Sequence, residues 1–181
     1  MPAFVALLRG VNVGNAKRVP MAELRRVLED LGCTNVATLL NSGNAVFRRA
    51  KAPSAKVAAE IATSIAAVLN VAVPVVVKSS SEYEAIIKDN PFVSHAVDRS
   101  RLLVSFTQDS KALSTLASLA ALAGPPDEFS LGKHAAYLHC ATGILESKIG
   151  AAVLGKAGGS ATTRNWATCL KLHNLISERE P

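Results

Sequence analysis

The sequence predicts an α+β protein made of two ferredoxin-like (βαββαβ) plaits, the second divergent and followed by C-terminal helices. Over the first 78 residues, short apolar runs of strand length alternate with amphipathic stretches of helix length. This alternation gives the order βαββαβ, and right-handed crossovers leave few other ways to pack it. A similar order recurs from Ser79 onward. We therefore expect a first half over residues 1–78 and a second half over residues 79–181.

The first half is expected to hold four strands and two helices. Pro20 suits the first turn of a helix, where its missing N–H is harmless, and apolar residues then recur at three- and four-residue steps until Gly32. The turn formers at 41–44 separate two short strand-like runs, which predicts a tight hairpin. The expected strands are 3–8, 36–40, 45–47 and 73–77, and the expected helices begin near Pro20 and Pro53.

The second half is expected to repeat this order less regularly. Its predicted strands are 102–106, 128–131 and 136–140, and its predicted helices are 82–88, 111–122, 145–154 and 163–177. Two loops rich in glycine and proline or serine, 124–127 and 155–160, separate these segments.

Composition limits the classes of function. Of the 181 residues 49% are hydrophobic, which is enough for a buried core, and no run approaches the roughly 20 apolar residues of a membrane span. The N-terminus lacks the basic region of a signal peptide, so a cytoplasmic location and no membrane partner are expected.

The cysteines and the net charge limit the chemistry further. The three cysteines, Cys33, Cys140 and Cys169, are scattered along the chain, which favours reduced thiols. The net charge of +6 favours anionic partners.

Two polar segments are expected to meet at one edge of the first sheet. In a plait the first and second strands run parallel, so the first loop (residues 9–18) lies beside the hairpin turn (residues 41–44). The first loop also leads into a helix N-terminus, which attracts anions. A phosphate or carboxylate is the expected ligand; alternatively, these glycines and asparagines serve only the turns. The candidate ligand-binding residues here are Arg9, Asn12, Lys17, Arg18, Asn41, Ser42 and Asn44.

Familiar catalytic and nucleotide-binding motifs are absent from both segments. Gly10 and Gly14 lack the Lys-Ser/Thr end of a P-loop, and Ser42 lacks the flanking residues of a nucleophile elbow. The catalytic residues are therefore unknown, and whether the protein is an enzyme stays open. No metal site is expected, because the four histidines are isolated: His95, His134, His139 and His173. No cofactor is expected either.

A third polar segment, residues 162–172, is expected to begin a helix. Arg164 would lie in its first turn, where the helix dipole disfavours a cation, so a carboxylate, a backbone carbonyl or a bound anion is expected beside it. Arg164 completes the candidate ligand-binding set. Trp166 is interpreted as a core anchor, because aromatic residues make up only 4% of the chain.

These segments together resemble the bacterial domain-of-unknown-function family 1697. The resemblance implies a cytosolic protein of two ferredoxin-like halves, in a family without an assigned function. The sequence departs from the family pattern at Asn15, Leu39, Ala167 and Cys169. The resemblance is carried by Leu-Leu-Arg-Gly-Val-Asn-Val-Gly at 7–14, by 21–24 with 31–32, by Thr38, by Asn-Ser-Gly-Asn at 41–44, by Asn-Pro-Phe at 90–92 and by Thr-Arg-Asn-Trp at 163–166.

The expected function is binding of a phosphorylated small molecule or nucleotide at the first loop and the hairpin turn. One alternative is nucleic-acid binding across an open sheet, although the first half lacks the aromatic-bearing strand that stacks bases. Another is a non-catalytic protein-interaction module. The sequence leaves the oligomeric state open.

Overall fold

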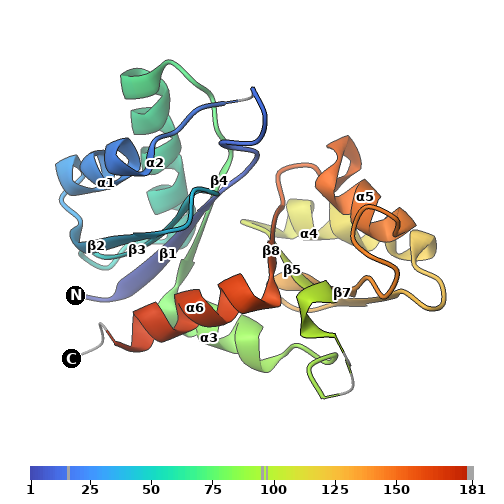
Figure 1. The fold of residues 1–181 in the computed structure, drawn as a ribbon. Helices are drawn as coiled ribbons and strands as arrows, with labels where there is room; N and C mark the ends of the chain where they lie inside the picture. The colour runs from blue at the N-terminus through green and yellow to red at the C-terminus, as the bar shows by residue number, and fades with distance from the viewer. Residues whose placement is uncertain (16, 95, 97, 179–181) are drawn as a thin grey trace. The chain divides into compact units, whose positions relative to one another are not determined.

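The computed structural model describes residues 1–15, 17–94, 96 and 98–178. These residues form an α+β fold with two four-stranded antiparallel sheets and six α-helices (Figure 1). No helix in the described part of the chain is long and apolar enough to cross a membrane.

The first sheet holds strands β1 to β4 in the order β2-β3-β1-β4, and every pairing is antiparallel. Helix α1 lies between β1 and β2 in the chain, and helix α2 lies between β3 and β4, so the element order is βαββαβ. The bounds are β1 Ala3–Leu8, α1 Met21–Asp30, β2 Thr34–Leu39, β3 Asn44–Arg48, α2 Ser54–Leu69 and β4 Val75–Ser79.

The second sheet has the corresponding order, β6-β7-β5-β8, again with antiparallel pairings only. Helix α4 joins β5 to β6, and helix α5 joins β7 to β8. The bounds are β5 Leu102–Phe106, α4 Ser110–Ala117, β6 Glu128–Leu131, β7 Ala135–His139, α5 Lys148–Leu154 and β8 Thr162–Asn165.

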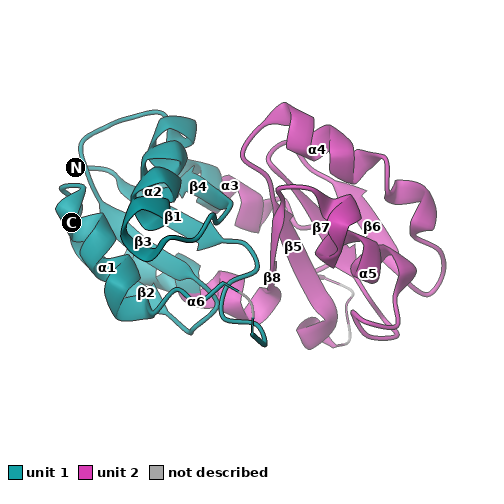
Figure 2. Ribbon diagram, turned by 90° about the horizontal axis from the view of Figure 1, so that it is seen from above, with its two compact units in different colours: residues 1–83, 172–181 teal, residues 84–171 magenta. Residues whose placement is uncertain are grey.

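Two further helices carry the chain from one compact unit to the other. The chain divides into a first unit, residues 1–83 with 172–181, and a second unit, residues 84–171 (Figure 2). The divisions fall inside α3 (Ser80–Lys88) and α6 (Trp166–Ser177). The chain therefore ends in the unit in which it began. That residues 1–78 and 79–181 form separate domains stays a prediction.

The core of the first unit fills one face of its sheet. Strand β1 contributes Phe4, Ala6 and Leu8, which alternate along the strand as a period of two requires. These residues belong to one buried cluster with apolar side chains of α1 and α2. The rings of Phe4 and Phe47 stack with their centroids 5.9 Å apart. The other face of β1 is buried as well, because Ala3, Val5 and Leu7 are at most 2% exposed.

Three expected helices in the second half differ from the structure at their ends. The helix expected at 111–122 is interrupted, because α4 ends at Ala117 and a 3₁₀ turn follows at Ala120–Leu122. The helix expected from residue 145 begins at Lys148, where the Ser147 side chain accepts a hydrogen bond from Gly150 N at 3.1 Å. Local capping sets this start.

The third difference concerns the helix expected from residue 163. Residues Thr162–Asn165 form strand β8 instead, paired with β5, and the helix begins at Trp166. The side chain of Asn165 accepts a hydrogen bond from Thr168 N at 2.8 Å, so Asn165 caps this helix. Pairing with β5, a contact between distant parts of the chain, overrides the helical pattern of the segment.

Candidate functional site

Asn12 fastens the first loop to the hairpin turn. Its amide Nδ2 donates to the backbone oxygens of Asn41, at 2.7 Å, and Val19, at 2.8 Å, and its Oδ1 accepts from Val19 N at 2.9 Å. The φ angle of Asn12 is 57°, in the left-handed region that asparagine tolerates better than most residues. All three hydrogen bonds of the Asn12 side chain are made with other residues of the protein, so its amide stabilises the arrangement of the loop and the turn.

Asn44 organises the hairpin turn from within. This residue is fully buried, and its Nδ2 donates to Leu39 O and to Ser42 Oγ, both at 2.9 Å. The two bonds close the turn across its base and hold the Ser42 hydroxyl. Asn44 and Ser42 therefore belong to the internal framework of the hairpin turn.

Gly43 brings the hairpin turn against the end of β1. Its φ is 79°, and a Cβ built on it would lie 2.6 Å from Leu8 Cβ and 2.8 Å from Val11 Cγ2. Its carbonyl oxygen accepts a hydrogen bond from Leu8 N at 2.8 Å. Only glycine combines this backbone conformation with so close an approach.

The cations of the first loop differ in exposure. Arg9 is half-buried, burial lowers the pKa of its guanidinium, and its backbone N–H donates to Pro74 O at 3.0 Å. Lys17 and Arg18 are exposed. Neither of their side chains makes a hydrogen bond or ion pair with another residue that the structure describes. Ala16, in the same loop, lies outside the described residues.

A pocket of 330 Å³ opens at this loop, and we call it the α1 pocket. It adjoins the start of α1, where no side chain caps the helix N-terminus. Arg18 supplies its cation and Asn41 its second amide, while Pro20 and Met21 are its apolar members. The residues that line the α1 pocket are Asn12, Gly14, Arg18, Pro20, Met21 and Asn41.

A second pocket of the first unit, 580 Å³ in volume, lies where α2 and α3 begin. It is lined by Ser54, Ser79 and Glu82 among others. The Glu82 carboxylate accepts a hydrogen bond from Ser54 Oγ at 2.7 Å. Ser79 N also donates to Glu82, at 2.8 Å, and the sequence carried a signal for this second contact as the capping pattern Ser-x-x-Glu at 79–82.

Arg164 lies in the second unit, on strand β8 opposite Val104. The expectation of a place in the first turn of a helix is wrong, because that helix starts two residues later. Its Nη1 donates to Thr162 Oγ1 at 2.7 Å and to Thr163 O at 2.9 Å. A side-chain hydroxyl and a backbone carbonyl thus accept from its guanidinium. Its inclusion among the ligand-binding residues stays a prediction.

Trp166 follows directly and is 3% exposed. Its indole nitrogen Nε1 is buried and has no hydrogen-bond partner within the described part of the chain.

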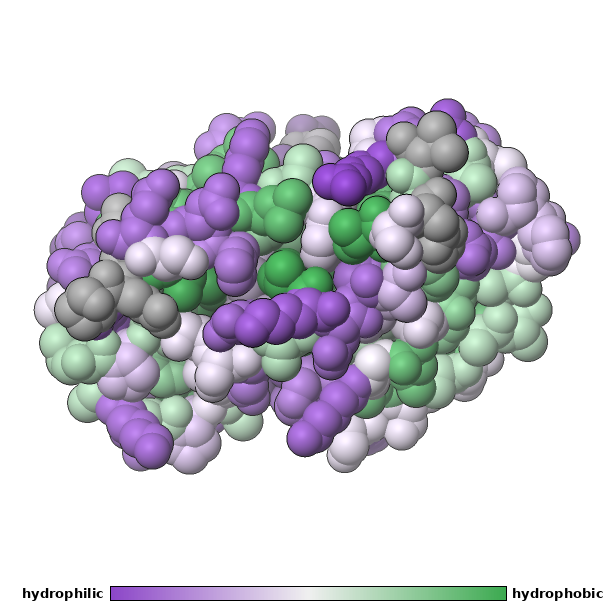
Figure 3. Space-filling view, turned by 90° about the horizontal axis from the view of Figure 1, so that it is seen from below, coloured by the Kyte–Doolittle hydropathy of each residue, from purple (hydrophilic) through white to green (hydrophobic). Residues whose placement is uncertain are grey.

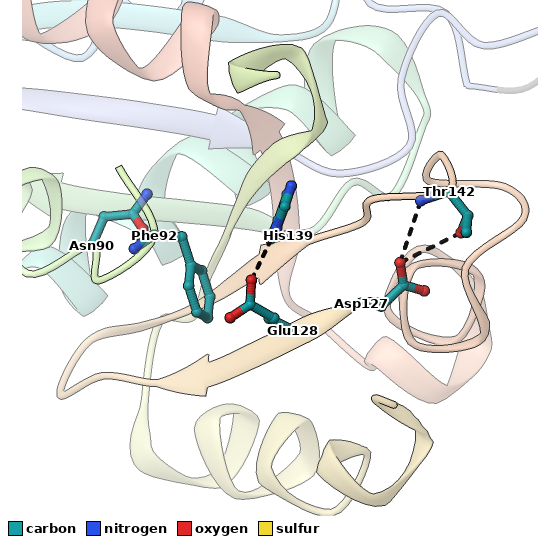
Figure 4. A network of polar contacts seen from close by, with 6 residues as sticks. All are labelled: Asn90, Phe92, Asp127, Glu128, His139 and Thr142. Atoms are coloured by element: carbon teal, nitrogen blue, oxygen red, sulfur yellow. Dashed lines mark hydrogen bonds and ion pairs between the residues drawn. The ribbon is translucent and has the colours of Figure 1, made fainter. Parts of the chain in front are cut away.

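Polar pairs of the second unit lie at the ends of its strands (Figure 4). His139 Nδ1 lies 3.1 Å from Glu128 Oε1, because the register of β6 and β7 sets these residues opposite each other. The backbone N–H and the hydroxyl of Thr142 both donate to Asp127 Oδ1 at 3.4 Å. Sequence analysis predicted neither pair, because the partners are separated in the chain and only the pairing of β6 with β7 brings them together.

No group of three or more His, Cys, Asp or Glu side chains that could hold a metal occurs among the described residues. His95, one of the four histidines considered, lies outside them.

Comparisons with known proteins identify the family. The family described as "Protein of unknown function (DUF1697)" matches residues 1–137. No curated protein matches the chain. Among solved structures, a conserved bacterial protein from Streptococcus pneumoniae is similar with a TM-score of 0.81 and 23% identity, over 97% of this chain and 98% of that chain. This likeness shows a shared fold. The chain belongs to the DUF1697 family.

Proposed function

We propose that the first unit binds a phosphorylated small molecule or nucleotide in the α1 pocket. The observation that carries this proposal is the position of Arg18. Arg18 is exposed and is one of the residues that line the pocket, and its side chain makes no hydrogen bond or ion pair with another residue that the structure describes. The planar guanidinium fork matches the oxygens of a phosphate and binds them with charge-assisted hydrogen bonds.

The charge of the surrounding sequence supports an anionic ligand. Residues 1–22 contain three cationic side chains, Arg9, Lys17 and Arg18, and no Asp or Glu. The first carboxylate in the chain is Glu23, inside α1. The uncapped N-terminus of α1 adds backbone N–H groups and the positive end of a helix dipole. The cationic side chains and the helix dipole therefore both favour a negatively charged ligand.

The proposal assigns binding and assigns no reaction. The lining of the α1 pocket consists of two asparagines, an arginine, a glycine, a proline and a methionine. None of these side chains is a nucleophile or a general base of the kinds that enzymes use.

Titration of the purified protein with inorganic phosphate and ribose 5-phosphate tests the proposal, with Arg18→Ala as the variant. Arg18→Ala removes a charge-assisted contact worth about 1.5–3 kcal/mol, so we expect the dissociation constant to increase roughly 10- to 100-fold. Arg25→Ala is the matched control, because Arg25 is exposed on α1 and lies outside the lining of the pocket. Calorimetry should show the loss for Arg18→Ala only.

Two outcomes contradict the proposal. In one, neither compound binds or raises the melting temperature. In the other, both variants weaken binding equally, which would indicate attraction by net charge alone. Tight binding of oligonucleotides that falls steeply with salt would instead support the nucleic-acid alternative.

We also infer that each unit is a ferredoxin-like plait. The element order βαββαβ and the antiparallel strand orders β2-β3-β1-β4 and β6-β7-β5-β8 support this assignment. The cytoplasmic location stays a prediction.

A further inference from the structure

Strand β6 forms an open edge of the second sheet, where it pairs with β7 alone (Figure 2). The hairpin between these strands is closed by Gly132 N, which donates to Ala135 O at 2.8 Å. Because hydrogen-bonded positions alternate along an antiparallel pair, the backbone N–H and C=O groups of Phe129 and Leu131 point away from β7. Neither backbone makes a hydrogen bond with a described residue beyond that sheet.

Strand β2 has the corresponding place in the first sheet, and its edge is irregular. Its pairing with β3 shifts register between Thr34 and Ala37, and Asn35 between them has a φ of 52°. Bulges of this kind hinder the addition of a further strand. In contrast, β6 keeps one register with β7 from Glu128 to Leu131. The edge of β6 therefore remains a regular template for another strand.

The side chains of Phe129 and Leu131 share one face of β6, because residues two apart in a strand point the same way. Phe129 packs against the buried core of the second unit, whereas Leu131 is 44% exposed. Single exposed apolar residues are ordinary on protein surfaces, and Figure 3 shows a face on which apolar residues lie among hydrophilic ones. What distinguishes Leu131 is its place on an open strand edge.

The edge of β6 is complementary to itself. When two copies of β6 run antiparallel about a twofold axis at Ser130, Phe129 of each copy lies opposite Leu131 of the other. Both residues point their backbone groups outward, so each N–H meets a C=O across the axis. Their side chains meet on the same face, and apolar pairs directly opposite each other stabilise a sheet.

The charges at the two ends of β6 fit the same register. Asp127 precedes the strand, and Lys133 lies in the hairpin turn that follows it. The register sets Asp127 of each copy opposite Lys133 of the other. Both Thr142 contacts reach Asp127 Oδ1, so Oδ2 makes no hydrogen bond or ion pair with a described residue. Lys133 is exposed, and its side chain likewise has no such partner in the described ranges.

A neighbouring register fits less well. Shifting one strand by two residues keeps the outward backbone groups in line but sets Phe129 opposite itself. Asp127 then lies opposite Leu131, which places a carboxylate beside an apolar side chain. The register about Ser130 is the one that matches backbone groups, apolar side chains and charges together.

We propose that β6 pairs antiparallel with β6 of a second copy of this chain, which joins two four-stranded sheets about a twofold axis. Complementary charge argues for a second copy as the occupant of this edge. The strand is only four residues long, so the contact is small and the dimer dissociates on dilution.

Sedimentation equilibrium of the purified chain at concentrations up to about 1 mM tests the proposal. We expect a monomer–dimer equilibrium. Leu131→Pro removes an outward N–H that the fold itself does not use, and proline is tolerated on edge strands. This variant should be a monomer throughout, with an unchanged circular dichroism spectrum.

Charge reversal tests the register and does not depend on the proline variant. Asp127→Lys and Lys133→Asp each set like charges opposite each other, so each should raise the dissociation constant of the dimer by roughly fivefold or more. An equal mixture of the two variants sets opposite charges together again and should recover dimerisation to within about twofold of the unchanged protein. Lys156→Asp, an equal charge change at an exposed residue of the second unit outside this edge, is the control and should have no effect.

Three outcomes overturn the proposal. The first is a monomer at every concentration, which would leave this edge to a strand of a different protein. The second is a dimer that a folded Leu131→Pro variant leaves intact. The third is a mixture of the two charge variants that associates no better than either variant alone. None of these outcomes bears on phosphate binding in the first unit.

Discussion

Ser79 and Glu82 cap the start of α3 reciprocally. Ser79 N donates to Glu82 Oε2 at 2.8 Å, and Glu82 N donates to Ser79 Oγ at 3.3 Å, which is the arrangement of a capping box. Burial by itself raises the pKa of Glu82. Hydrogen bonds from Ser79 and Ser54, together with the charge of Lys78, outweigh that effect, so the pKa lies below its ordinary value. The carboxylate is therefore held in its ionised form.

The depressed pKa of Glu82 predicts a pH-dependent contribution to stability. A carboxyl whose pKa is lower in the folded state stabilises the fold above its unfolded pKa, near 4.3, and this contribution is lost as pH falls through the folded pKa. Glu82→Gln should therefore lower the free energy of unfolding most above about pH 5, and the difference from the unchanged protein should shrink toward pH 3. Urea denaturation over this range measures it. A difference that is constant with pH would contradict the assigned role.

Asn12→Ala should destabilise the protein more than substitutions of exposed residues usually do. The variant loses three hydrogen bonds, each of about 1 kcal/mol, and places alanine at a φ of 57°. We expect a loss of roughly 2–4 kcal/mol in urea denaturation. Asn12→Gly removes the same bonds without backbone strain and should lose less. Equal losses would show that the hydrogen bonds account for the whole effect.

Gly43→Ala and Gly14→Ala form a matched pair. Both glycines have positive φ, 79° and 57°, but a Cβ at Gly43 meets Leu8 and Val11, whereas a Cβ at Gly14 has no atom within 4 Å. Gly14→Ala should cost about 1–2 kcal/mol from strain alone. Gly43→Ala should cost roughly 2–4 kcal/mol, because a steric clash is added. If the two melting temperatures fall equally, the close approach at Gly43 is unimportant.

Tyr137→Phe tests a buried hydrogen bond of the second unit. Tyr137 is 2% exposed, and its hydroxyl donates to Ile86 O at 2.8 Å. Burial raises the pKa of this phenol, so it stays protonated and remains a donor over the whole range in which the protein is handled. The variant should lose about 1–3 kcal/mol, because a buried carbonyl is left without this donor. Phe106→Leu, a core change without a polar group, is the control for altered packing in the same unit.

The sequence by itself determined the kinds of element in the first unit and their order. The apolar steps of two and of three to four residues that predict β1 and α1 are local, and they can be read without knowing any contact. The turn formers at 41–44 likewise predicted a hairpin. In the structure Gly43 supplies a backbone with positive φ, and the Asn44 side chain donates hydrogen bonds within the turn. The proximity of the first loop to that turn followed from topology, and the bond from Asn12 to Asn41 joins them.

Only the tertiary structure decided which polar residues remain available. Asn12 and Asn44 look like Asn41 in the sequence, yet the side-chain amides of the first two donate hydrogen bonds within the fold. The side chain of Asn41 makes no hydrogen bond with another described residue. Pairing with β5 placed Arg164 on a strand, and the register of β6 and β7 set His139 beside Glu128. These contacts join residues far apart in the chain. Such contacts form only when the chain is folded, so a local sequence pattern does not predict them.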